Sequence, residues 1–394
     1  MTLAYILLIP ILFANGFINI LPYRGNKIKN IEIESEETFV LPPVSFCDDE
    51  KYNLNWYVVG ESKKIKKNKI NKATIWGKHY AFWNNGTSYF CVDDSCTHRG
   101  ASLSIGKLNK NNIVCPYHAY EFDTGGKLCV VPGLPNFQNT PCQNLNSYPI
   151  LVKNGWIYIN TINENTYNKD VTEKNSRVFE EPESKDEQFK PIFLNKDFNA
   201  YGRIVSENSL DIMHIGFVHT FGNAKSPSPL NEVPPFKVDD VPFHYKTIYN
   251  YTSGENSMVK RVFQMDDLLI ENEFILPHTT IARVIFGRFR STIITFALPI
   301  NVTHSKLFVK AYRNFWYNYE SSYFRGWLND IGDYFTTDTM SKTIVQDKSV
   351  VESIPLDKVD GMFNMKYDKL QNLYTSLYKK LVHNISSSLE FLQK

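Results

Sequence analysis

Two short motifs each combine one cysteine with one histidine: Cys96-Thr-His98 and Cys115-Pro-Tyr-His118. Two thiolates and two imidazoles match the ligands of a mixed-ligand [2Fe–2S] cluster, in which one iron takes both cysteines and the other takes both histidines. This ligation raises the reduction potential above that of an all-cysteine cluster. Cys96, His98, Cys115 and His118 are therefore predicted to hold a cluster that relays single electrons.

Zinc is the alternative occupant of these four residues, since Cys2His2 is also a zinc-binding set. Zinc fingers usually pair cysteine with cysteine and histidine with histidine, whereas here each motif supplies one of each. The ligand order therefore favours the iron–sulfur cluster.

The residues around both motifs resemble the Rieske domain of the Rieske non-haem iron oxygenases. The resemblance includes Gly125-Gly126-Lys-Leu-Cys and Val131-Pro132 and extends over residues 54–160. It implies an all-β Rieske [2Fe–2S] domain, which we place at residues 50–165. Respiratory Rieske subunits carry an extra cysteine in each ligand loop, but Gly100 or its neighbours and Tyr117 occupy those places here, which argues against a pure electron carrier.

A second pair of histidines, His214 and His219, follows Glu207-Asn208-Ser-Leu-Asp211. Five residues advance an ideal helix by about 500°, so the two side chains would lie about 140° apart. Only an irregular or terminating helix could bring both onto one metal. An isolated pair of this spacing would more often be one core and one surface histidine.

The oxygenase family carries the same Asn-x2-Asp-x2-His-x4-His pattern, and this resemblance implies that His214 and His219 bind a mononuclear Fe(II). A facial triad also needs a carboxylate, which leaves the opposite side of the iron open. The resemblance of Gln346-Asp347 to the family points to Asp347 on a late helix. The nearby acids Asp333, Asp338 and Glu352 are rivals.

Asp211 lies three residues before His214, and a metal-bound imidazole commonly donates its other N–H to a carboxylate. The family resemblance further implies that this aspartate connects the mononuclear site to a Rieske histidine of a neighbouring subunit in a homotrimer. A helix-terminus charge is the simpler role for Asp211. Asn208 is predicted to lie near the iron or to cap a helix.

Length and composition fit two soluble domains, because 394 residues with 43% hydrophobic content can form two ordinary cores. The net charge of +2 predicts no nucleic-acid partner. The sequence contains no phosphate-binding glycine loop, dinucleotide fingerprint or further cysteine cluster. Electrons are therefore expected from a separate ferredoxin or NAD(P)H-dependent reductase.

Residues 1–23 contain no charged side chain and are mostly apolar, although Pro10 and Gly16 interrupt the run. About twenty such residues are enough to cross a bilayer. Arg24, Lys27 and Lys29 follow the segment, so the positive-inside rule places the body on the cytoplasmic side. We predict an N-terminal membrane anchor, with a membrane-lying segment as the alternative.

The region 166–190 is rich in Asn, Glu, Lys and Asp and is predicted to be a linker. Residues 191–394 would form the catalytic domain, a helix-grip arrangement of an antiparallel sheet with helices, so that the whole chain is α+β. Cys91 and Cys129 are expected to be buried in strands. Alternating runs predict strands at 260–263, 270–276, 280–286, 291–298 and 306–312.

Pro299, Tyr312-Arg-Asn-Phe-Trp316 and Gln346-Asp347 most resemble the chlorophyllide a oxygenase and pheophorbide a oxygenase branch, with vanillate demethylase-like monooxygenases close by. The resemblance implies a monooxygenase that uses dioxygen to hydroxylate, desaturate or demethylate an apolar ring substrate such as a tetrapyrrole, a sterol or an aromatic compound. A membrane-anchored sterol desaturase is a competing assignment. The alternative function is a membrane-anchored Rieske electron-transfer protein without oxygenase activity.

Overall fold

The computed structural model describes residues 56–162, 178–238, 243–317 and 325–381. The predicted anchor at residues 1–23 lies outside these ranges. Among the helices in the described ranges, none is both long and apolar enough to span a bilayer.

Residues 56–162, here called the β-domain, contain strands and short 3-10 turns but no α-helix within their described length. The strands form three small antiparallel sheets, in the orders β1-β10-β9, β2-β3-β4 and β5-β6-β7-β8. Their bounds are β1 Trp56–Glu61, β2 Asn71–Ile75, β3 Lys78–Asn84, β4 Tyr89–Asp93, β5 Lys107–Asn109, β6 Asn112–Val114, β7 Glu121–Phe122, β8 Leu128–Val130, β9 Ile150–Lys153 and β10 Trp156–Asn160.

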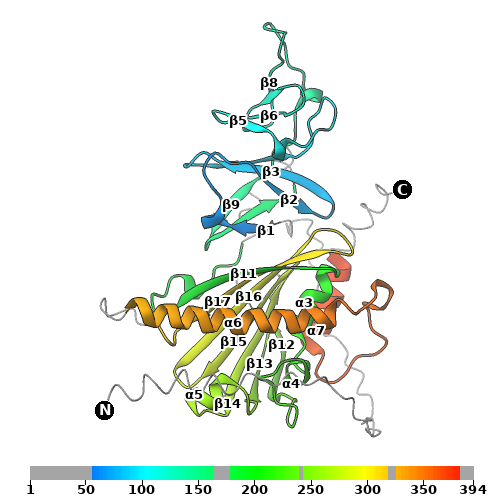
Figure 1. Ribbon diagram of the computed structural model, residues 1–394. Helices are drawn as coiled ribbons and strands as arrows, with labels where there is room; N and C mark the ends of the chain where they lie inside the picture. Colours follow the sequence, from blue (N-terminus) through cyan, green and yellow to red (C-terminus); the bar gives the residue numbers. More distant parts are fainter. Residues whose placement is uncertain (1–55, 163–177, 239–242, 318–324, 382–394) are drawn as a thin grey trace. The chain divides into compact units, whose positions relative to one another are not determined.

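A seven-stranded antiparallel sheet of order β11-β17-β16-β15-β14-β13-β12 dominates the rest of the chain (Figure 1). Its strands are β11 Lys190–Phe198, β12 Leu230–Lys237, β13 His244–Thr252, β14 Asp267–Ile275, β15 Thr279–Phe286, β16 Phe289–Pro299 and β17 Ser305–Arg313. The helices are α3 Gly202–Leu210, α4 Ile215–Val218, α5 Met258–Phe263, α6 Arg325–Val351 and α7 Lys369–Leu381. An all-β domain followed by this sheet and its helices confirms the predicted α+β class.

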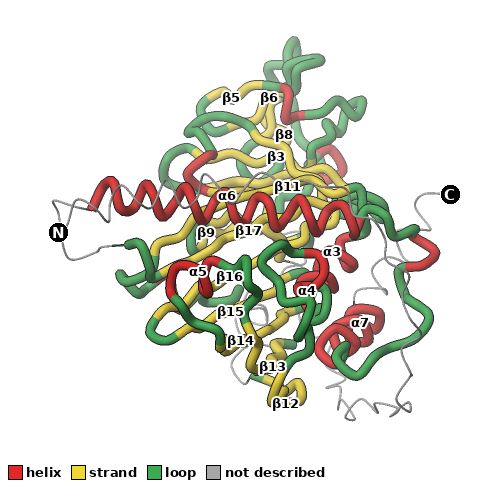
Figure 2. Tube along the Cα trace, turned by 60° about the horizontal axis from the view of Figure 1, so that its bottom comes forward, coloured by secondary structure: helices red, strands yellow, loops and turns green. Residues whose placement is uncertain are grey.

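One face of the large sheet, here called the helix face, is covered by α3, α6 and α7. Helix α6 runs across the strands (Figures 1 and 2). Ile204 of α3 and Ile344 of α6 share a buried cluster with Ala297 and Val309, whose side chains leave their strands on this face. Phe274 makes the corresponding contact with α7. The helix-grip arrangement therefore arises because alternate residues of β14, β16 and β17 are apolar toward the helices.

The other face of the sheet packs against the β-domain. Tyr57 of β1 and Trp156 of β10 share a buried cluster with Ile294, Phe296 and Phe308, which alternate with the helix-face residues along β16 and β17. The backbone N–H of Trp76 also donates to the Pro299 carbonyl at 2.9 Å. We call this the β-domain face, and it is separated from the helices by the thickness of the sheet.

Two regions differ from the sequence-based expectations. Residues 260–263 lie in helix α5 and not in a strand, because the Ser257 side chain caps the helix by accepting from the Lys260 N–H. The part of the predicted linker that the structure describes, from residue 178 on, packs against the protein. Glu181 and Glu183, on either side of Pro182, are both 1% exposed and pack on the sheet.

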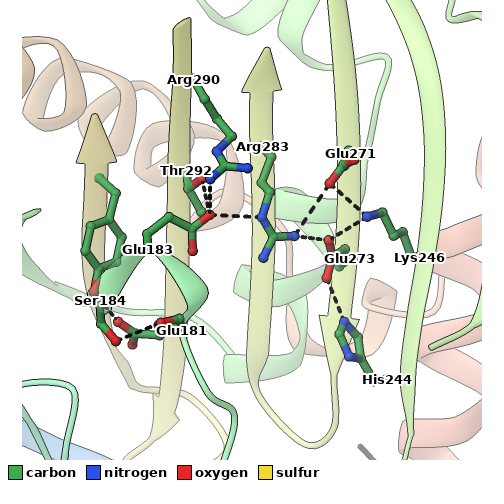
Figure 3. Close-up of polar contacts among 11 residues, drawn as sticks. Glu181, Glu183, Ser184, His244, Lys246, Glu271, Glu273, Arg283, Arg290 and Thr292 are labelled. Atoms are coloured by element: carbon green, nitrogen blue, oxygen red, sulfur yellow. Dashed lines mark hydrogen bonds and ion pairs between the residues drawn. The ribbon is translucent and has the colours of Figure 1, made fainter. Parts of the chain in front are cut away.

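A network of buried ion pairs fixes this segment to the β-domain face (Figure 3). Glu183 accepts from Arg283 Nε at 3.1 Å and from Thr292 Oγ1 at 2.8 Å, and Arg283 also pairs with Glu273. Glu181 accepts from Lys310 Nζ at 2.6 Å. Because a buried charge is costly without its partner, each of these carboxylates holds the segment in one place. The network is completed by His244, Lys246, Glu271, Arg290 and Tyr312.

Glu183→Ala is expected to lower the free energy of unfolding by about 3 kcal/mol, since it leaves Arg283 and Thr292 buried without this acceptor. Chemical denaturation followed by circular dichroism measures the change. Glu187→Ala is the control, because Glu187 is exposed in the same segment and its loss should cost less than about 0.5 kcal/mol. Equal stability of the two variants would show that the network does not hold the segment.

Candidate metal centre

Three predicted ligands, His214, His219 and Asp347, converge on the helix side of the sheet. One ligand atom from each residue lies within 4.8 Å of the other two. Among the described residues, no other group of three or more potential metal ligands lies this close together. Asp347 Oδ1 is 3.4 Å from His214 Nε2 and 3.3 Å from His219 Nε2. The three side chains are 12%, 4% and 19% exposed, so the site is largely shielded from water.

The helix that carries the histidines is interrupted, as their spacing requires. Helix α3 ends at Leu210, Asp211 is extended with ψ 122°, and a new short helix α4 starts after His214. His219 ends α4 in an extended conformation, and the two imidazole centroids lie 5.0 Å apart. Because α3 and α4 each end within this segment, His214 and His219 point toward the same place. A continuous helix would direct the two side chains apart.

The other ring nitrogen of each histidine is held by an oxygen atom. His214 Nδ1 lies 2.7 Å from the Asp211 carbonyl oxygen, and His219 Nδ1 lies 3.1 Å from Gln346 Oε1. Both oxygens accept, so each Nδ1 carries the proton and each Nε2 presents a lone pair toward Asp347. Asp347 Oδ1 is buried and has no hydrogen-bond partner among the described residues. Two lone pairs and a carboxylate oxygen at this separation need a cation between them, which suits a divalent metal.

Burial and charge act differently on the two imidazoles. Burial lowers the pKa of His219. Burial acts in the same direction on His214, but the contacts with Asp347 and Asp211 together outweigh it and raise the pKa of His214. The carboxylate therefore attracts positive charge to this point.

The rival acids are engaged elsewhere. Asp333 pairs with Arg313 and Lys190, and Asp338 pairs with Lys342 on the exposed side of α6. Glu352 accepts from the Asn199 N–H at 2.6 Å and pairs with Lys348 at 3.1 Å. Each of the three acids thus has a partner in the protein and needs no metal.

Asp211 differs in detail from its expected role. Its carbonyl, and not its carboxylate, lies against the His214 imidazole; Oδ1 of the carboxylate accepts from the backbone N–H groups of Met213 and His214. This carboxylate therefore forms the turn that opens α4. Asn208 lies inside α3, so the helix-capping expectation is wrong, and its side chain makes no hydrogen bond to another described residue.

A glycine allows the chain to turn back after His219. A Cβ added at Gly222 would lie 1.8 Å from the Ile215 carbonyl oxygen, so no larger residue fits. The Phe221 ring stacks on His219 with centroids 4.9 Å apart. The turn thus fixes the second imidazole between its own α4 helix and an aromatic ring.

In the β-domain, the two cluster motifs form equivalent loops. The Cys96 N–H donates to the Ala101 carbonyl and the Gly100 N–H donates to the Cys96 carbonyl. Cys115, Ala119 and Tyr120 repeat both bonds at the same spacing. Gly100 and Ala119, the fourth residue after each cysteine, both have positive φ, at 73° and 56°. Each loop therefore curls around its cysteine in the same way.

The donors of the two loops fit a cluster with mixed ligands. Cys96 and Cys115 are each 3% exposed, while the rings of His98 and His118 are exposed, with their centroids 4.7 Å apart. Burial raises the pKa of the Cys96 thiol to about 11, so a thiolate here requires a bound metal to stabilise it.

The remaining described cysteines form no disulfide. Cys91 is buried in β4 as expected. Cys129 is exposed, contrary to expectation, because the two-residue alternation of β8 buries its neighbour Leu128 instead.

Residues 55–149 match the family model described as Rieske [2Fe-2S] domain. The chain contains a Rieske domain. This confirms the prediction of a [2Fe–2S] cluster. The β-domain is called the Rieske domain from here on.

Relatives extend the similarity beyond the Rieske domain. Cholesterol 7-desaturase nvd 1 of Ciona intestinalis is 25% identical over 187 residues, 45% of this chain and 36% of that protein. Chloroplastic chlorophyllide a oxygenase of Chlamydomonas reinhardtii is 29% identical over 105 residues, 26% of this chain and 16% of that protein. The alignments thus span little more than a third of these relatives at most.

The crystal structure of dicamba monooxygenase bound to 3,6-dichlorosalicylic acid has a TM-score of 0.71 at 17% identity, covering 85% of this chain and 98% of that one. The chain therefore shares its fold over nearly the whole length of that enzyme. The resemblance to the Rieske non-haem iron oxygenases is confirmed.

Asp347→Ala removes one ligand and is expected to weaken iron binding by about tenfold or more. The purified variant should therefore have lost about 90% or more of the mononuclear iron, while the visible spectrum of the Rieske domain stays intact. Asp338→Ala, on the same helix, is the control and should keep the iron. Metal analysis of anaerobically purified protein measures both. Full iron content in Asp347→Ala would transfer the ligand role to another acid.

Proposed function

We propose that the chain is a Rieske non-haem iron monooxygenase, an oxidoreductase that uses dioxygen and externally supplied electrons to hydroxylate, desaturate or demethylate an apolar ring substrate. The convergence of His214, His219 and Asp347 in a chain that also has a Rieske domain supports this proposal. An electron-transfer protein without oxygenase activity has no use for a second metal site. We therefore favour the enzyme over that alternative.

The residues of the chain divide the work. Cys96, His98, Cys115 and His118 would hold the cluster, and His214, His219 and Asp347 would hold Fe(II). When bound, these groups would supply single electrons and activate dioxygen, respectively. The protein orients both imidazoles through the Asp211 carbonyl and Gln346 and largely shields the three side chains from water.

The substrate class is proposed from the relatives and from the fold. One relative is named for a chlorophyllide and the other for cholesterol, and dicamba monooxygenase was solved with a chlorinated aromatic acid. A tetrapyrrole, a sterol and an aromatic compound share an apolar ring system. On the helix side of the sheet, a buried cluster of apolar side chains includes Ile212, two residues before His214, so the surroundings of the triad are apolar, as such a compound would require.

We propose that electrons pass from the Rieske domain of one chain to the mononuclear iron of a neighbour in a homotrimer. Within one chain, the Rieske domain packs on one face of the large sheet and the triad lies on the other, so the sheet stands between them. Tyr117, beside His118, is 63% exposed, and Phe217, between His214 and His219, is 66% exposed. Large exposed apolar side chains beside both sites suit a contact between them. A separate ferredoxin or reductase would supply the electrons.

We also propose that residues 1–23 anchor the protein to a membrane with the catalytic body on the cytoplasmic side, which would suit a membrane-derived substrate. The absence of charge from these residues supports the anchor. Deleting residues 1–23 should move the protein into the soluble fraction without changing either metal content. Full-length protein that is washed from membranes by carbonate would rule the anchor out.

Metal analysis tests the proposed enzyme directly. Anaerobically purified full-length protein should contain about three irons and two acid-labile sulfides per chain, two irons from the cluster and one from the triad. His98→Ala should lose the electron paramagnetic resonance signal of the cluster but keep the iron held by the triad. Two irons in the wild type would support the electron carrier, and zinc without an iron–sulfur signal would refute the Rieske assignment.

Asp211→Asn tests the intersubunit route. The amide is nearly isosteric and can still accept from the N–H groups of Met213 and His214, so both metals and the oligomer should be retained. The lost negative charge should slow cluster reoxidation in the presence of oxygen and substrate by at least about tenfold, while reduction by the donor stays normal. Stopped-flow absorbance measures both steps. Reoxidation at the wild-type rate would limit Asp211 to shaping the turn.

A further inference from the structure

Three buried polar atoms on neighbouring strands have no hydrogen-bond partner among the described residues: Tyr249 OH, Asn272 Oδ1 and Glu232 Oε1. Tyr249 is 1% exposed and Asn272 is 4% exposed, and the Glu232 side chain is 7% exposed. Native proteins satisfy most buried polar atoms, because each unsatisfied atom costs free energy. Among the described residues, these three atoms therefore have hydrogen-bonding capacity left for a bound polar group.

All three side chains leave the sheet on the helix face. Asn272 of β14 donates through Nδ2 to the Leu210 carbonyl at 3.3 Å, at the end of α3. Glu232 of β12 pairs through Oε2 with Lys369, the first residue of α7. Tyr249 of β13 shares a buried apolar cluster with Ile212, two residues before the iron ligand His214. The cluster thus faces the chain segment that carries the metal ligands.

The sheet register brings the three residues together. Asn272 pairs with Thr247 across β13 and β14, so Tyr249 is its diagonal neighbour on the same face. On the other side of β13, Leu230 pairs with Asn250 and Val233 with Ile248, so Glu232 lies beside Tyr249. Long side chains at these positions are within reach of one another.

The hydrogen-bonding capacities of these atoms select a hydroxyl group. Because the Asn272 amide nitrogen is already used, its free atom is an acceptor, whereas the Tyr249 hydroxyl can donate. A ligand hydroxyl can accept from Tyr249 and donate to Asn272, but a carbonyl can only accept. Lys369 already balances the charge of Glu232, so a cationic or anionic ligand would bring an uncompensated charge into a buried site.

We propose that Tyr249 and Asn272 form the polar anchor of the substrate site and bind a hydroxyl group on an otherwise apolar ring substrate, with Glu232 closing the anchor beside Tyr249. The inference rests on the proposed oxygenase function and narrows its substrate class. Burial raises the pKa of Tyr249, which keeps its phenol protonated and able to donate. Ile212, Leu268 and Ile270 pack in the same buried apolar cluster as Tyr249, so the anchor has apolar neighbours.

Equilibrium binding of two sterols to the anaerobic full-length holoenzyme tests the proposal. The probes are cholesterol and 5-cholestene, which differ only in the hydroxyl group, and their dissociation constants are measured with radiolabelled sterol. The wild type should bind cholesterol about five- to tenfold more tightly than 5-cholestene. Tyr249→Phe should abolish this preference by weakening cholesterol binding alone.

Tyr251→Phe is the matched control, because Tyr251 lies on the same face of β13 but its hydroxyl already accepts from the Asn223 N–H. It should keep the wild-type preference for cholesterol. Equal weakening of both sterols in Tyr249→Phe would show a purely structural role and overturn the anchor, as would an unchanged preference. A wild type that binds neither sterol, or binds both equally, would overturn the hydroxyl assignment, while the iron and sulfide content of the same sample reports separately on the proposed function.

Discussion

Mutual repulsion between the electron-rich atoms of His214, His219 and Asp347 is the constraint around which the large sheet and its helices are organised. Two imidazole lone pairs face one carboxylate oxygen at 3.3 and 3.4 Å, an arrangement that is unfavourable without a cation. The fold resists this repulsion by holding each group from behind. The Asp211 carbonyl fixes one imidazole, Gln346 fixes the other, and packing of α6 on the sheet fixes the carboxylate.

This requirement explains why regular structure fails at the site itself. A continuous helix from α3 would separate the histidines. The chain is instead extended at Asp211 and forms a four-residue helix before His219. The lost helical hydrogen bonds are replaced by the Asp211 carboxylate, which accepts from Met213 and His214. The rigid seven-stranded sheet and the 27-residue helix α6 provide the frame against which this irregular segment is held.

The sequence predicted more of the site's chemistry than of its geometry. The order of cysteine and histidine indicated the cluster, and the spacing of His214 and His219 required an interrupted helix, which the structure contains. The choice of Asp347 over Asp333 and Asp338 depended on family resemblance, because which acid of a long helix faces a metal depends on how the helix packs on the sheet.

The features that the sequence did not predict are mainly contacts between segments far apart in the chain. Gln346 supports His219 across more than a hundred residues of chain, and no local pattern marks that contact. Likewise, the richness of residues 166–190 in Asn, Glu, Lys and Asp suggested a solvated linker, whereas Glu181 and Glu183 pair with cationic residues of β17 and β15. The misassigned strand at 260–263 shows the reverse case, in which a local signal, the Ser257 cap, outweighed an alternating pattern.

The burial of both cysteines and the exposure of both histidines in the Rieske domain give the electron relay a single docking side. Electron transfer between proteins slows steeply with separation, so a donor and the surface of a neighbouring catalytic domain would both need to approach the imidazole edge. In the proposed homotrimer the neighbouring chain stays at that edge, so the donor would have to approach the part of the edge that the neighbour leaves uncovered. The rate at which the cluster is loaded would therefore depend on how much of the imidazole edge stays open in the assembled protein.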